Sequence, residues 1–158
     1  MGRYYSNQFG EEGKFWFAVQ PSDDPATVFG ATDVTDESGE EGFDEGYVDY
    51  DISDDEFVKK KIDEQYDILE VPKDKRRYEI PIGKRVPYIW SELFDYIFTY
   101  DKEKGVDDFP YGDMKDGKHI TYYPLSKKKE LAASRLDLGL FIYDTIKRDG
   151  FCSLTAEL

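Results

Sequence analysis

The chain has 158 residues and a formal net charge of −14, from 35 acidic and 21 basic side chains. This charge repels nucleic acid and anionic lipid and attracts basic surfaces, so we expect neither nucleic acid nor a membrane as a direct partner. Aromatic residues make up 16% of the chain, which is more than disordered chains contain. We therefore expect one folded domain over residues 1–158.

The single cysteine, Cys152, excludes an intrachain disulfide. The N-terminus lacks the apolar run of a signal peptide, and no window approaches the roughly 20 apolar residues of a membrane span. We expect a cytoplasmic protein, which would work in the host cytoplasm if it is encoded by a phage.

The first third of the chain predicts a hairpin and a short helix. Aromatic and β-branched runs at 3–9 and 14–20 flank Gly-Glu-Glu-Gly, whose glycines at 10 and 13 would form the turn. The second run has large apolar residues on both faces, as in a central strand. Asp24-Pro25 would start a short helix that Gly30 can close.

Residues 33–46 are rich in glycine and acids and predict a long loop, which is either functional or mobile. Residues 47–52 alternate, with one acidic face and one apolar face, and predict a strand. Ser53-Asp54-Asp55-Glu56 matches a capping box and predicts a helix to about Leu69. Its apolar stripe should pack on the sheet; it consists of Val58, Ile62, Tyr66 and Leu69.

The second half predicts further strands at 76–82 and 119–123, a helix opening at Pro87, a polar loop at 105–117, a helix from Ser126 to about Arg148, and an edge strand in the tail 151–158. The fold class is α+β, with a mostly antiparallel sheet and about three helices packed on it.

Charge is distributed very unevenly along this chain. Residues 15–58, which we call the acidic window, carry 14 carboxylates and no Lys, Arg or His, whereas acids and bases balance in the rest. One interpretation is a solvated tract that keeps the protein soluble. However, aromatic residues recur among the acids, and Asp49 and Asp51 on one strand face would stand about 6.8 Å apart, comparable to successive phosphates. Such a surface offers an Arg- or Lys-lined groove what a polynucleotide offers, with the rings as anchors.

Other chemistries find less support. An EF-hand loop starting at Asp49 fails, because its sixth residue is Asp54 instead of Gly and its twelfth is Lys60 instead of Glu. An irregular divalent-metal site in the acidic region stays open. The lysine and arginine clusters at 59–61, 73–77 and 127–129 are flanked by acids, which favours solvated faces or pairing with the acidic window over a nucleic-acid patch.

Catalysis would have to use very few residues. His119-Ile120-Thr121 is similar to the His-x-Thr element of two-histidine phosphoesterases, but the chain has only one histidine. Cys152 acting as nucleophile with His119 as base has no sequence pattern to support it. We expect no enzyme activity, no cofactor and no metal.

The size and charge resemble those of small phage and mobile-element proteins that block nucleic-acid-handling defence enzymes, namely anti-CRISPR and anti-restriction proteins. Arg3-Tyr4-Tyr5, followed by the GKFWFAVQ segment at 13–20, is similar to the openings of small phage and bacterial proteins. The resemblance implies a non-enzymatic inhibitor that occupies the basic nucleic-acid channel of a partner, with a CRISPR effector or a nuclease as the expected target. The alternatives are an immunity protein that neutralises a cationic nuclease toxin and a metal-dependent phosphodiesterase.

The partner-binding residues expected from this interpretation are the acids of 33–56 and two tyrosine anchors: Asp33, Asp36, Glu37, Glu40, Glu41, Asp44, Glu45, Tyr47, Asp49, Tyr50, Asp51, Asp54, Asp55 and Glu56.

Overall fold

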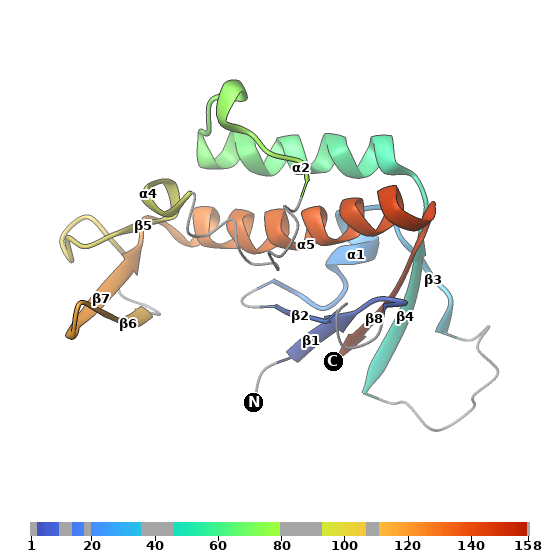
Figure 1. Ribbon diagram of the computed structural model, residues 1–158, viewed down its shortest axis with the longest axis horizontal. Helices are drawn as coiled ribbons and strands as arrows, with labels where there is room; N and C mark the ends of the chain where they lie inside the picture. The colour runs from blue at the N-terminus through green and yellow to red at the C-terminus, as the bar shows by residue number, and fades with distance from the viewer. Residues whose placement is uncertain are drawn as a thin grey trace.

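A long helix, α5 (Lys127–Asp149), forms the middle layer of the molecule (Figure 1). A second helix, α2 (Asp55–Leu69), packs along one side of α5, and a five-stranded sheet lies on its other side. A three-stranded sheet lies beside the N-terminal end of α5. The computed structural model describes residues 3–9, 14–17, 20–35, 46–79, 93–106 and 111–157.

Every strand pair in these ranges is antiparallel, which confirms the predicted α+β class with antiparallel sheet. The larger sheet has the order β2-β1-β8-β4-β3 and the smaller one β5-β7-β6. The strands are β1 (Arg3–Ser6), β2 (Lys14–Phe17), β3 (Thr32–Asp33), β4 (Tyr47–Ile52), β5 (Phe98–Thr99), β6 (Tyr111–Lys115), β7 (Lys118–Pro124) and β8 (Cys152–Glu157). The short helical turns are α1 (Asp24–Thr27), η3 (Lys73–Lys75) and α4 (Phe94–Ile97).

Side-chain caps define the ends of the two long helices. The carboxylate of Asp54 accepts a hydrogen bond from the Phe57 amide at 3.1 Å, so α2 is capped one residue later than the predicted capping box implies. The Ser126 hydroxyl accepts from the Lys129 amide at 3.1 Å, as predicted for α5. Gly150 ends α5 with a φ of 82°, a conformation that suits glycine.

The predicted apolar stripe of α2 is fully buried, but it does not pack on the sheet. It faces α5, which lies between α2 and the five-stranded sheet. Because α5 is covered on both sides, it is buried around most of its circumference rather than along one stripe. Gly139 marks the close approach, since a Cβ there would lie 2.8 Å from Ile62 Cγ1.

Two strands occupy positions in the sheet opposite to those predicted. The C-terminal strand β8 is central, between β1 and β4, and pairs with β4 from Cys152–Ile52 to Glu157–Tyr47. Strand β2, predicted to be central, is at the edge. Lateral position depends on pairing between distant segments, which the composition of one strand does not specify.

In the second half, several predicted elements are wrong in the part the structure describes. Residues 76–79 are in no strand, and Phe98 begins β5 instead of continuing a helix. The predicted loop at 105–117 contains β6, which joins β7 through Asp116 and Gly117, both with positive φ. Asp-Gly is a strong two-residue hairpin signal that the loop prediction overlooked. The other parts of these predictions, at 80–92 and 107–110, and the predicted hairpin turn at 10–13 lie outside the described residues.

Candidate functional site

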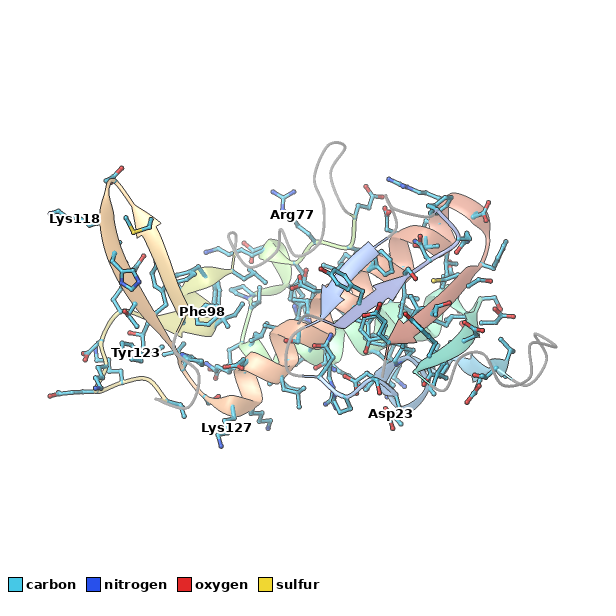
Figure 2. All side chains as sticks on the ribbon, turned by 90° about the horizontal axis from the view of Figure 1, so that it is seen from below. Asp23, Arg77, Phe98, Lys118, Tyr123 and Lys127 are labelled. Atoms are coloured by element: carbon cyan, nitrogen blue, oxygen red, sulfur yellow. The ribbon has the colours of Figure 1, made fainter. Side chains whose placement is uncertain are left out.

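One face of the five-stranded sheet is turned away from α5, and Figure 2 looks at the molecule from that side. Side chains alternate along its strands: Tyr50 and Ile52 of β4 are buried, and so are Leu154 and Ala156 of β8. The alternate positions point outward. We call this surface the outer sheet face and define it as Tyr4 and Ser6 of β1, Tyr47, Asp49 and Asp51 of β4, and Ser153, Thr155 and Glu157 of β8.

Two carboxylates of this face are held in place by hydroxyl groups of the neighbouring strand. Asp49 and Asp51 stand directly across from Thr155 and Ser153 in the β4–β8 register. The Thr155 hydroxyl donates to Asp49 Oδ1 at 2.7 Å, and the Ser153 hydroxyl donates to Asp51 Oδ1 at 3.1 Å. Within the ranges the structure describes, neither carboxylate forms an ion pair with a lysine or arginine.

A row of two tyrosines and one glutamate crosses the same face. Glu157 is the register partner of Tyr47, and its Oε2 accepts a hydrogen bond from the Tyr4 amide at 3.1 Å. Tyr4 and Tyr47 are 41% and 42% exposed, although both belong to regular strands. Tyr47 was predicted as an anchor, whereas Tyr4 and Glu157 were missed. The alternation of the tail, with apolar residues at 152, 154 and 156, could have placed Glu157 outward.

Tyr50, the other predicted anchor, does not belong to this surface. It is only 4% exposed and lies in the hydrophobic core, where burial raises the pKa of its hydroxyl. A buried ring is not accessible to a partner, so the anchor prediction for Tyr50 is wrong. The alternation of 47–52 already places Tyr50 on the side of Val48 and Ile52.

Of the remaining predicted acids, Asp33 and Asp54 have local hydrogen-bond partners, Glu56 is exposed, and six lie outside the residues that the structure describes. Asp33 Oδ1 accepts from the Thr35 amide and hydroxyl, at 2.9 and 2.6 Å, and these bonds lower the pKa of Asp33. Asp54 caps α2, and Glu56 in the first turn is exposed. Six acids lie outside the described residues: Asp36, Glu37, Glu40, Glu41, Asp44 and Glu45.

Asp55 is partly neutralised within the chain. Its Oδ2 lies 3.0 Å from Lys147 Nζ on α5, and the hydrogen bond from Lys147 lowers the pKa of the Asp55 carboxyl. Both side chains remain substantially exposed, so this ion pair stabilises the fold little. It does reduce the negative charge that Asp55 can present to a partner.

Asp24, another acid of the acidic window, has a structural role. Asp24 is fully buried, and its two oxygens face the Arg135 guanidinium, with Nε–Oδ2 at 2.9 Å and Nη2–Oδ1 at 3.2 Å. Burial raises the pKa of Asp24, and Arg135 only partly offsets that effect. The pair joins α1 to α5 across 111 residues of sequence, a distance at which no local pattern reveals a partner.

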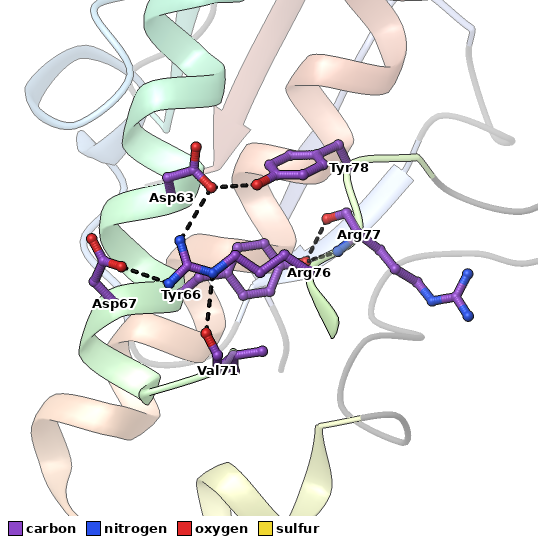
Figure 3. A network of polar contacts seen from close by, with 7 residues as sticks. All are labelled: Asp63, Tyr66, Asp67, Val71, Arg76, Arg77 and Tyr78. Carbon is purple, nitrogen blue, oxygen red and sulfur yellow. Dashed lines mark hydrogen bonds and ion pairs between the residues drawn. The ribbon is translucent and has the colours of Figure 1, made fainter. Parts of the chain in front are cut away.

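Arg76, one member of the basic cluster at 73–77, is used within the fold (Figure 3). Arg76 lies between α2 and the chain that follows it: Nη2 is 2.6 Å from Asp67 Oδ1 and Nη1 is 3.4 Å from Asp63 Oδ1. The Tyr78 hydroxyl donates a hydrogen bond to the same Asp63 oxygen. Burial, and to a smaller extent the neighbouring Asp63 carboxylate, raises the pKa of Tyr78 to about 12. Arg76 therefore has a structural role, and its partners Asp63 and Asp67 lie in α2, beyond the acidic window with which the sequence interpretation paired this cluster.

The catalytic alternatives gain no support from the arrangement. His119 is exposed on β7, which precedes α5, whereas Cys152 begins β8, which follows it. The 23 residues of α5 extend about 34 Å at 1.5 Å per residue, so these two side chains lie at opposite ends of the molecule. Burial also raises the pKa of the Cys152 thiol to about 12, which suppresses the nucleophilic thiolate.

In the part of the chain that the structure covers, no three His, Cys, Asp or Glu side chains come together as a metal site. None of the helices within the described ranges combines the length and the apolar character needed to cross a membrane.

A comparison of the chain with profiles of known families, with curated proteins and with solved structures finds no match to any of them.

Proposed function

We propose that this chain is a non-enzymatic inhibitor that places its outer sheet face in the basic nucleic-acid-binding surface of a partner protein. The observation that carries the proposal is the pair Asp49 and Asp51. These carboxylates alternate on β4, point away from α5, and are oriented by hydroxyl donors rather than by cations.

The geometry suits a surface that normally receives phosphates. Side chains two residues apart on a strand are separated by about 6.8 Å, which is comparable to successive phosphates of a nucleic-acid strand. Each carboxylate accepts through Oδ1 from a neighbouring hydroxyl, so little side-chain freedom remains to be lost on binding. Charge-assisted hydrogen bonds from arginine or lysine to such carboxylates are stronger than neutral ones.

The chain's net charge of −14 supports the same conclusion. It accelerates encounter with a basic partner and disfavours association with polyanions and with a second copy of the chain. A CRISPR effector is the partner class we favour, because of the resemblance in size and charge. A cationic nuclease toxin has the same surface chemistry, and the captured protein's identity distinguishes the two.

The experiment is capture of partners from host lysate with the tagged wild-type chain and with an Asp49→Asn/Asp51→Asn variant. Asparagine keeps an oxygen to accept from Thr155 and Ser153, so the variant removes charge and keeps the local hydrogen bonds. A hydrogen bond to a charged group contributes about 1.5 kcal/mol. Losing two should weaken the captured complex by roughly 100-fold, and added salt should weaken the wild-type complex.

Asp95→Asn/Glu103→Gln is the matched control, because it removes two exposed charges near α4 and β5, away from the outer sheet face. It should bind as the wild type does. The proposal fails if the Asp49/Asp51 variant melts at the wild-type temperature and still binds the partner with full affinity. Binding that requires a divalent ion and disappears with a chelator would instead favour the metal-dependent alternative.

A further inference from the structure

We propose that Tyr4, Glu157 and Tyr47 form a binding site for an arginine side chain of the partner. The inference rests on the proposed function and deepens it, because it names the chemical group that the outer sheet face receives. It uses the row formed by the exposed Tyr4 and Tyr47 and the half-buried Glu157, which crosses β1, β8 and β4, three neighbouring strands of the sheet.

The spacing of the strands suits a planar cation between two rings. Adjacent strands lie about 4.8 Å apart, so the Tyr4 and Tyr47 backbones, two strands apart, stand roughly 10 Å from each other. Glu157 lies between them, as the register partner of Tyr47 and the acceptor of the Tyr4 amide. A guanidinium above Glu157 would have a ring on each side, within the roughly 6 Å at which cation–π attraction is significant.

The carboxylate gives the site its charge and direction. Glu157 Oε2 is held 3.1 Å from the Tyr4 amide nitrogen, which fixes the side chain toward β1. Each carboxylate oxygen accepts more than one hydrogen bond, so the bond from Tyr4 leaves capacity for a guanidinium. Among the residues described here, no lysine or arginine forms an ion pair with Glu157.

This arrangement should prefer arginine to lysine. Arginine offers a flat, weakly hydrated fork that bonds a carboxylate along its edge while its faces stack on aromatic rings. Lysine has a compact, strongly hydrated charge and cannot do both. Asp49 lies one row further along β4 on the same face, so an extended basic segment of the partner can place a second cation there.

The test uses two peptides of equal charge, octa-arginine and octa-lysine, titrated into the full chain at low ionic strength by calorimetry. The wild type should bind octa-arginine about tenfold more tightly, which corresponds to two exposed cation–π contacts. A Tyr4→Leu/Tyr47→Leu variant should bind both peptides equally. Tyr4→Phe/Tyr47→Phe keeps the rings and should keep the preference.

Tyr100→Leu is the matched control, because Tyr100 is 55% exposed but follows β5 in the other sheet. It should leave the arginine preference unchanged. The inference is overturned if the wild type binds the two peptides equally or not at all, or if the leucine variant retains the preference. The proposed function is judged separately, by partner capture with the Asp49/Asp51 variant. The two hypotheses can therefore be separated. The peptides can reject the arginine site while partner capture still depends on Asp49 and Asp51, and the arginine preference can be present while partner capture does not depend on them.

Discussion

Replacing Gly139 by alanine should destabilise this protein, although alanine is the better helix former. A Cβ at this position of α5 would lie 2.8 Å from Ile62 Cγ1 and 2.8 Å from Phe29 Cε1. Carbon atoms normally approach to about 3.5–4.0 Å. Ile62 and Phe29 are 0% and 1% exposed, so neither side chain can turn into solvent. The helices α2 and α5 must separate, or the core must repack.

The magnitude follows from two opposing terms. Alanine in a helix interior is favoured over glycine by about 1 kcal/mol. Overpacking a close-packed core costs about 1–3 kcal/mol, and contact with two side chains from different parts of the chain places this site in the upper part of that range, at about 2–3 kcal/mol. The net loss should be about 1–2 kcal/mol, which at this chain length lowers Tm by roughly 2–8 °C.

Thermal and urea unfolding, followed by circular dichroism, measures this loss. Gly46→Ala is the control, because no atom of the residues that the structure describes lies within 4 Å of its added Cβ, and it should leave Tm unchanged or slightly higher. In an Ile62→Ala background the cost of Gly139→Ala should shrink, because Cγ1 is gone. A Gly139→Ala protein that melts at or above the wild-type temperature would refute the close-approach argument.

Three further predictions concern groups with distinctive environments. Arg76→Leu removes both ion pairs to α2 and should accelerate amide hydrogen exchange over 71–79; unchanged exchange there would mean that the arginine does not hold the segment. Cys152, with its pKa raised to about 12 by burial, should react with a thiol reagent at pH 8 only after denaturation, and equal rates in native and denatured protein would contradict its burial. The Asp55 pKa, lowered by Lys147, should rise toward its ordinary value in Lys147→Met when followed by NMR. The stabilisation from this carboxylate is present above the unfolded-state pKa and is lost as pH falls through the folded-state pKa.

The candidate site was only partly visible in the sequence. Alternation along 47–52 predicted that Tyr47, Asp49 and Asp51 share a face, and β4 confirms it. Among the acids of the acidic window, Asp24 is buried against Arg135, and Asp55, a predicted binding residue, pairs with Lys147. Arg135 lies 111 residues from Asp24 and Lys147 lies 92 residues from Asp55. The sequence of the acidic window therefore does not indicate either pairing.

Local chemistry in the sequence determined the long helices and the strand β4. Ser126 and Gly150 mark the ends of α5, and Asp54 caps α2, because a cap is a contact between near neighbours in the chain. Only the tertiary structure decided that the tail becomes the central strand β8, and that Glu157 thereby comes to lie between Tyr4 and Tyr47. Strand order and side-chain pairing across a sheet depend on the burial of α5 against that sheet and on hydrogen bonds between distant segments. Neither can be read from the sequence of a single segment.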